Sequence, residues 1–199
     1  MERDGFPRRI KLKDGSSIDI VQAGAQEGPA LLDFYRSLSE EDRLVLKDDV
    51  TTPDWLARFL GKLASGEAQS LVARAGSKIC GEATLHRNIY GWSRHVGEIR
   101  LNVASDRRGQ GVGYALAAGV VKLAIDSGLE KMVAYLVESQ AAARKTFERL
   151  GFRKEAELVR HVTDIRGAKR DLLIYANDVS HIWTAMEALV EDYRTHEGQ

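Results

Sequence analysis

The sequence has little of several features that would commit it to particular classes of protein. It contains one cysteine, Cys80, so no disulfide can form within the chain. No uninterrupted apolar stretch approaches the roughly 20 residues of a membrane-spanning helix. The longest candidate, between Val112 and Ile125, is interrupted by Tyr114 and Lys122. Nothing near the N-terminus combines a basic start with the apolar run of a signal peptide. These absences predict a soluble protein of the reducing cytoplasm, without a membrane partner.

The sequence also lacks an excess of charge of either sign. Its 29 Lys and Arg residues balance 29 Asp and Glu residues, so long-range attraction to nucleic acid or to an anionic membrane is not expected. The 199 residues, 44% of them apolar, suffice for one substantial core. We find no repeat, low-complexity run or linker. We therefore expect one domain over residues 1–178 and an amphipathic helical extension over 179–199.

Alternating and helical patterns follow one another in an order typical of a mixed α/β fold. A hairpin is predicted first, around the turn signal Asp14-Gly15-Ser16, and is followed by two helices between residues 29 and 64. Three strands should then form an antiparallel meander, and a closing hairpin should end the domain. The later strands are predicted over residues 69–75, 79–89, 95–103, 132–137, 152–163 and 170–176, and the later helices over 111–127 and 141–150.

A glycine-rich segment, Arg108-Gly109-Gln110-Gly111-Val112-Gly113, follows a predicted strand and opens a predicted helix. The first N–H groups of a helix have no partner within it, and the helix dipole is positive at that end. Glycine lets the backbone approach a phosphate without an intervening Cβ. The segment therefore predicts an anion site suited to a diphosphate, to which Arg107 and Arg108 add positive charge.

Two other phosphate-binding motifs do not match the residues of this segment. A dinucleotide fingerprint would need glycine at Tyr114 or Leu116, and no Gly-Lys-Ser/Thr follows to make a P-loop. A non-catalytic alternative is a glycine-rich turn that caps a tightly packed helix.

The segment resembles the Arg/Gln-x-x-Gly-x-Gly/Ala signature of the GNAT superfamily, whose members hold the pyrophosphate of acetyl-CoA with it. The resemblance runs from about Leu71 to Ala176 and includes the ending Phe147-Glu148-Arg149-Leu150-Gly151-Phe152. It implies an α/β fold of the α+β type, with a mixed, mostly antiparallel, V-split sheet flanked by helices. The N-terminal hairpin and the segment Phe34-Tyr35-Arg36-Ser37-Leu38-Ser39 also resemble, more weakly, bacterial Pat-type protein-lysine acetyltransferases.

The resemblance also implies where the pantetheine arm of the coenzyme lies, between the strand ending at Val103 and the strand 132–137. Gln140 stands where many relatives have an asparagine that contacts the arm. Phe147 stands where many have a tyrosine that protonates the departing thiolate, and a phenyl ring has no proton to give. The implied cofactor-binding residues are Asn102, Val103, Arg108, Gly109, Gln110, Gly111, Val112, Gly113, Gln140 and Phe147.

Glu98 is the predicted catalytic residue. An acceptor ammonium must lose a proton before it attacks the thioester, and a carboxylate can take it. Glu98 lies on the strand that leads into the glycine-rich segment, at the place where GNAT lysine acetyltransferases commonly carry their general base. The structural alternative is that Glu98 only pairs with Arg100, its neighbour on the same face, which would lower its pKa and weaken it as a base.

The expected reaction is direct transfer of an acetyl group from acetyl-CoA to a primary amine, either a protein lysine or a small molecule. No metal-ligand spacing is present. Asp48 and Asp49 would suit a cationic amine, or are ordinary surface groups. The rival interpretations are a non-catalytic acyl-CoA sensor, favoured by Phe147, and a nucleotide-binding module. The apolar stripe of the extension predicts packing on its own domain or a homodimer interface.

Overall fold

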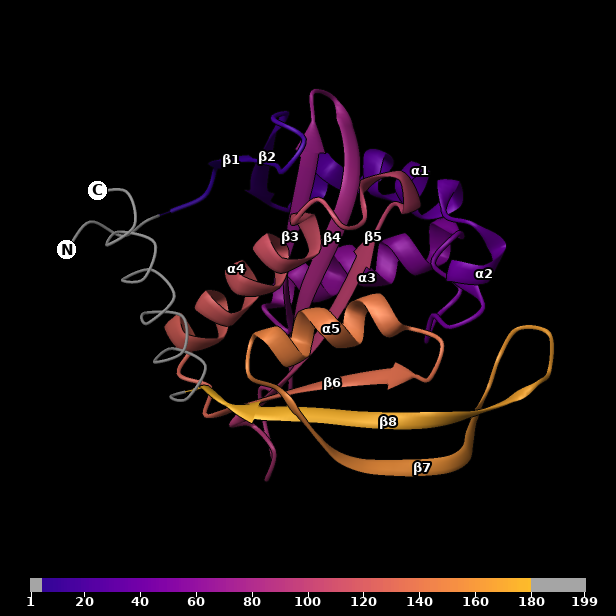
Figure 1. Ribbon diagram of the computed structural model, residues 1–199. Helices are drawn as coiled ribbons and strands as arrows, with labels where there is room; N and C mark the ends of the chain where they lie inside the picture. Colours follow the sequence, from indigo (N-terminus) through magenta and orange to yellow (C-terminus); the bar gives the residue numbers. More distant parts are fainter. Residues whose placement is uncertain (1–4, 180–199) are drawn as a thin grey trace, which may run out of the picture.

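The computed structural model describes residues 5–179, which form a mixed sheet of eight strands (Figure 1). The strand order is β1-β2-β3-β4-β5-β6-β8-β7, and every neighbouring pair is antiparallel except β5 with β6. The strands are β1 (Arg8–Lys11), β2 (Ser17–Gln22), β3 (Ala68–Ala75), β4 (Lys78–Arg87), β5 (Val96–Val103), β6 (Lys131–Val137), β7 (Arg153–Thr163) and β8 (Lys169–Asp178).

Helices cover both faces of the sheet (Figure 1). The long helix α4 packs on β3, β4 and β5, and α5 lies beside it, whereas α1 and α3 pack on the opposite face. Helix α3 begins where the hydroxyl of Thr52 accepts a hydrogen bond from the backbone N–H of Trp55, and it ends at Gly66 in the left-handed region. The α-helices are α1 (Gly28–Ser37), α2 (Glu40–Arg43), α3 (Pro53–Ser65), α4 (Val112–Asp126) and α5 (Ala141–Arg149).

The two faces of the sheet bury two separate hydrophobic cores. The larger core lies under α4 and includes Leu116, Val120 and Phe147. The smaller core lies under α1 and α3 and contains an aromatic series in which Tyr35 meets the edge of Trp55. Because α4 is apolar on nearly every side, it is held firmly between the sheet and its neighbours.

Strands β5 and β6 separate after a short stretch of pairing, which splits the sheet. Their only paired residues are Val96–Glu98 with Lys131–Val133, although β5 continues to Val103 and β6 to Val137. Beyond Glu98 the two strands diverge and leave backbone groups of both strands facing the opening. The V-split, mostly antiparallel sheet predicted from the sequence is therefore confirmed.

Most predicted elements are present with ends shifted by a few residues. The N-terminal hairpin, the meander β3-β4-β5 and the closing hairpin β7-β8 are confirmed. The short helix α2 was not predicted, because its four charged or polar residues carry no apolar period. The extension predicted over 179–199 lies outside the described residues apart from its first position, Val179. Among the described helices, none has the length and apolarity needed to span a bilayer.

Candidate active site

The glycine-rich segment forms an open, concave backbone turn at the start of α4. Gly109 and Gly111 have φ of +73° and +103°, a region that favours glycine, and a Cβ added to either would meet no atom within 4 Å. Gly111 is the N-terminal cap of α4, and no side chain caps the helix. The turn therefore offers backbone N–H groups and a positive helix end to an anion, with space for it to approach.

The side chain of Arg108 holds this turn in place. Its Nε donates a hydrogen bond to the carbonyl of Val103 at 3.1 Å, and its Nη2 donates to Oδ1 of Asp42 at 2.6 Å. The backbone N–H of Lys13 also donates to the carbonyl of Gln110 at 3.4 Å. These contacts tie the turn to the end of β5, to α2 and to the β1–β2 hairpin, so Arg108 has a positioning role besides its charge.

A long cleft of about 700 Å³ runs from this turn into the split between β5 and β6. This volume is in the range of ordinary ligand sites. Gln110 and Val112 stand apart from the cleft: the amide of Gln110 donates to the carbonyl of Asp106, and Val112 is fully buried in the core. The cleft is lined by seven of the predicted residues, Asn102, Val103, Arg108, Gly109, Gly111, Gly113 and Gln140.

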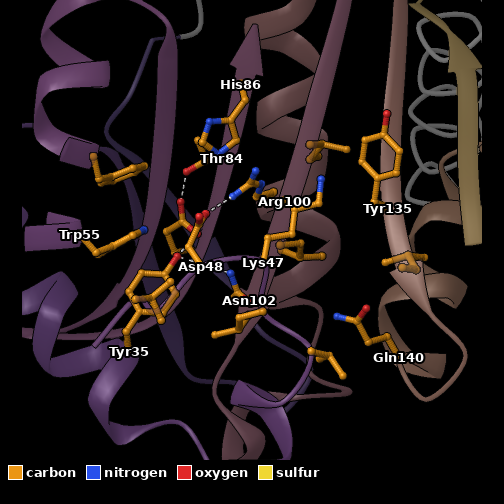
Figure 2. Close-up of a pocket in the computed structure, with 18 of the residues that line it drawn as sticks. Tyr35, Lys47, Asp48, Trp55, Thr84, His86, Arg100, Asn102, Tyr135 and Gln140 are labelled. Carbon is orange, nitrogen blue, oxygen red and sulfur yellow. Dashed lines mark hydrogen bonds and ion pairs between the residues drawn. The ribbon is translucent and has the colours of Figure 1, made fainter. Parts of the chain in front are cut away.

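A small cavity of about 120 Å³ adjoins the cleft at the split (Figure 2). Polar side chains of β4 and β5 form one wall, aromatic side chains of α1 and α3 form another, and Tyr135 of β6 stands opposite Arg100 and Lys47. Both cavities are lined by the same four residues, Val45, Leu101, Asn102 and Gln140. A molecule lying along the cleft would therefore end at the small cavity.

Glu98 lies in the wall of the split, at the last residue that pairs with β6. Its Oε1 accepts hydrogen bonds from Lys47 Nζ at 2.6 Å and from Arg100 Nε at 2.7 Å. Burial raises the pKa of Glu98, but the charge of Arg100 and the hydrogen bonds from Lys47 and Arg100 outweigh burial, so the pKa is lower than usual. The predicted pairing with Arg100 is present, and Lys47 is a second partner that the sequence did not indicate.

The charges around Glu98 continue into a chain of ion pairs. Arg100 Nη1 also donates to Oδ2 of Asp48 at 2.8 Å, which places one of the two predicted acidic residues at the small cavity. Asp49 points elsewhere and accepts from the hydroxyl of Thr51. His86 faces Glu98 across β4 and β5, and burial, aided by Arg100, lowers its pKa to about 4. His86 is therefore neutral at pH 7.

A second carboxylate, Glu82, lies one strand away in the same wall and is 1% exposed. Its Oε2 accepts from the hydroxyl of Tyr35 at 2.8 Å, and its Oε1 accepts from the hydroxyls of Ser70 and Thr84. Burial raises its pKa in spite of these hydrogen bonds. The sequence analysis missed this group. The alternation of Glu82, Thr84 and His86 on β4 was the available signal, because a two-residue period puts them on one face.

Two further predicted residues, Gln140 and Phe147, line the small cavity, and so does Tyr135 of β6. Gln140 Oε1 accepts from the backbone N–H of Val137, which fixes its amide beside the end of β6. Phe147 is 1% exposed, packs on Phe152 with ring centroids 5.3 Å apart, and lines the small cavity. Tyr135 is 37% exposed and lines the same cavity, so a tyrosine hydroxyl is present there although position 147 has none.

Replacing Glu82 with glutamine is expected to make the stability of the protein less dependent on pH, because the buried carboxyl at this position no longer titrates. A carboxyl whose pKa is raised by folding contributes its full stabilisation to the folded state at a pH below its unfolded pKa. This stabilisation is lost as the pH rises through the folded pKa. The free energy of unfolding of the variant should therefore increase relative to that of the wild type as the pH rises above about 4. Urea unfolding at a series of pH values measures the difference, with Glu157→Gln on exposed β7 as the control. A difference that does not change with pH would contradict this account of Glu82.

Among residues 5–179, no cluster of three or more histidine, cysteine, aspartate or glutamate side chains is arranged to hold a metal ion.

Residues 31–152 match the model of a family described as the acetyltransferase (GNAT) family. No curated protein sequence matches the chain. The fold is similar to a GCN5-related N-acetyltransferase from Kribbella flavida, with 26% identity, a TM-score of 0.68, and coverage of 81% of this chain and 97% of the other.

Two more distant structures share the fold. One is a ribosomal-protein-alanine N-acetyltransferase from Brucella melitensis, with 23% identity, a TM-score of 0.71, and coverage of 80% of this chain and 98% of the other. The other is yncA, a putative acetyltransferase from Salmonella typhimurium solved with acetyl-CoA, with 21% identity, a TM-score of 0.71, and coverage of 82% and 95%.

Proposed function

Because this chain belongs to the acetyltransferase (GNAT) family, and is thus an acyl-CoA-dependent N-acetyltransferase, we propose that it moves the acetyl group of acetyl-CoA directly onto a primary amine, with Glu98 as general base. The observation that carries the proposal is the position of Glu98 at the last paired residue before the split, in contact with Lys47 and Arg100 of the small cavity. A donor in the cleft and an amine in the cavity would meet beside this carboxylate.

The residues of the cleft fit acetyl-CoA. The turn at Gly109 and Gly111 leaves space for a diphosphate, and the uncapped start of α4 supplies donors to it. Asn102, Val103 and Gln140 lie farther along the cleft, where the facing edges of β5 and β6 are not paired with each other and could bond the pantetheine arm. Backbone N–H groups in the split would polarise the thioester carbonyl.

Glu98 would take a proton from the acceptor ammonium as the amine attacks the carbonyl carbon. The lowered pKa keeps Glu98 ionised at neutral pH, although it also makes the carboxylate a weaker base. The carbon–sulfur bond breaks as the carbon–nitrogen bond forms, and the thiolate takes up a proton. We propose Tyr135 as the side chain that assists the thiolate, since it lines the small cavity and Phe147 has no proton to give.

For the acceptor we propose a primary amine on an apolar arm, such as a protein lysine, with a small-molecule amine as the alternative. The small cavity combines the carboxylate of Asp48 with the rings of Trp55 and Phe59, and Glu98 lies beside it in contact with Lys47. Carboxylates favour the ammonium head of such a side chain, and aromatic rings favour its methylene stem. A similar fold carries out ribosomal-protein-alanine acetylation in the Brucella protein, which makes protein amines a reasonable first class to test.

A non-catalytic acyl-CoA sensor is the second candidate function. It is favoured by the two cations on Glu98, which lower its pKa, and by the phenyl ring at Phe147. A sensor would bind acetyl-CoA without ever releasing CoA thiol, so turnover with a panel of amines separates the two functions.

Location and assembly are further parts of the proposal. We place the protein in the cytoplasm, because its single cysteine, Cys80, is a buried thiol. A homodimer formed through the extension over residues 179–199 stays a prediction, as does the boundary between domain and extension at residue 178.

Saturating acetyl-CoA is expected to raise the thermal unfolding midpoint by about 5 to 11 °C, whereas ATP should leave it unchanged. A ligand at about 100 times its Kd stabilises the folded state by roughly 2.7 kcal/mol, which gives this rise for a chain of this length. Differential scanning fluorimetry with each ligand makes the comparison. An equal shift with ATP would reduce the glycine-rich turn to a general phosphate site, and no shift with either ligand would contradict the cofactor assignment.

A further inference from the structure

Lys47 extends from the segment between α2 and α3 into the small cavity (Figure 2). The residues on either side of it are held in place. Leu46 packs against the smaller core, and Asp48 forms the ion pair with Arg100. The backbone around Lys47 is thereby fixed, and its side chain is directed toward the split in the sheet.

The amino group of Lys47 lies where an acceptor amine would have to lie. Its Nζ is 2.6 Å from Oε1 of Glu98 and 3.9 Å from the centroid of the Tyr135 ring. Glu98 and Tyr135 come from the two strands that diverge at the split, so Nζ sits between them at the apex. Figure 2 shows the lysine between Arg100 and Tyr135. The contact with Glu98 is the contact that the proposed mechanism requires of a substrate amine.

The surroundings favour the neutral, nucleophilic form of this amine. Burial lowers the pKa of Lys47, and the adjacent charge of Arg100 lowers it further, against the opposing effect of Glu98. The Lys47 side chain is 39% exposed, so a proton released from the site can reach solvent. A surface lysine, by comparison, keeps its pKa near 10.4 and is almost fully protonated at pH 7.

We propose that Lys47 is an autoacetylation site, whose ε-amino group occupies the acceptor position and accepts the acetyl group within the same molecule. The inference rests on the proposed function, because acetyl-CoA is the donor and Glu98 the base. Glu98 takes one proton from the Lys47 ammonium, and the neutral nitrogen attacks the thioester carbon. The carbon–nitrogen bond forms and the carbon–sulfur bond breaks. The second nitrogen proton neutralises the departing thiolate, and Glu98 returns its proton to solvent.

Acetylation would change the site as well as the lysine. The amide that replaces the ammonium has no charge and one N–H donor, so it cannot keep the ion pair with Glu98. Glu98 would then keep Arg100 as its cationic partner, and its pKa would rise. The small cavity would carry a neutral acetamide in place of a cation beside Tyr135.

The test is to incubate the full-length protein with acetyl-CoA at pH 8 and to follow it by intact mass and by peptide mapping. We expect one acetyl group, at Lys47, added at a rate constant that does not depend on protein concentration. Lys47→Arg should abolish it and keep the positive charge. Lys78→Arg is the control, because exposed Lys78 at the start of β4 lines neither cavity, and it should leave the modification unchanged. Glu98→Gln should slow it by on the order of 100-fold.

Parallel reactions separate this inference from the proposed function. Each sample is also given a panel of primary amines, and the release of CoA thiol is measured. Acetylation of added amines with Lys47 unmodified would overturn the inference and leave the function intact. No thiol release from any sample, with Lys47 unmodified, would overturn both. Modification at Lys47 no faster than in urea-unfolded protein, unaffected by Glu98→Gln, or proportional to protein concentration, would also overturn it.

Discussion

Replacing Glu98 with glutamine is expected to slow acetyl transfer by about 100- to 10,000-fold, the usual contribution of a general base. Glutamine keeps the size of the side chain and can still accept a hydrogen bond from Arg100, but its amide cannot take a proton from the acceptor. Glu98 lies beyond the residues that line the long cleft, so the Kd for acetyl-CoA should stay the same. Initial rates of CoA thiol release, with the Kd from calorimetry, measure both quantities.

The control is Glu157→Gln, on the exposed strand β7, which should behave as the wild type. The pH dependence adds a second test. Burial raises the pKa of Glu98, but Arg100 and Lys47 bring it below the usual value, so the base is lost only at a pH below the range in which an ordinary glutamate titrates. Buried Glu82, with a raised pKa, would lose its charge at a higher pH. Full activity of Glu98→Gln would leave that glutamate with a structural role and make Glu82 the next candidate.

The parts of the fold that depend on neighbouring residues were predictable from the sequence. The turn at Asp14-Gly15-Ser16, the helix start at Thr52-Pro53 and the stop at Gly151 each follow from local backbone preferences, and each is present. The glycine-rich turn was predictable for the same reason, since its positive φ values need glycine. The split in the sheet came from the family resemblance, because no local pattern indicates where two parallel strands diverge.

The parts of the site that depend on distant residues were not predictable. Lys47 and Glu98 are far apart in sequence, and their contact exists because the segment after α2 folds over the end of the split. Glu82 was overlooked because its place on one face with Thr84 does not reveal its hydroxyl partners on other elements, such as Tyr35 on α1. Arg108 was predicted to bind a phosphate. Its contact with Asp42 could not be predicted, because Asp42 lies on α2, whose residues show no apolar periodicity.

Replacing Gly111 with alanine is expected to raise the Kd for acetyl-CoA by about 10- to 100-fold. The Cβ of alanine would meet no protein atom, so it would project into the space that the turn leaves for phosphate. Losing one hydrogen bond to a charged group costs about 1.5 to 3 kcal/mol, which gives this loss of affinity. Alanine in the left-handed conformation at φ +103° also lowers the stability of the folded protein by about 1 to 2 kcal/mol. Calorimetric titration and urea unfolding measure the two effects.

Gly76→Ala separates the effect on binding from the effect on folding. Gly76 also has a positive φ, +64°, with no atom within 4 Å of an added Cβ, but it lies in the β3–β4 turn and lines neither cavity. Both variants should lose about the same stability, because both put alanine in a conformation that favours glycine. Only Gly111→Ala should lose affinity. Equal Kd values for the two variants would mean that the turn at α4 shapes the backbone without touching the coenzyme.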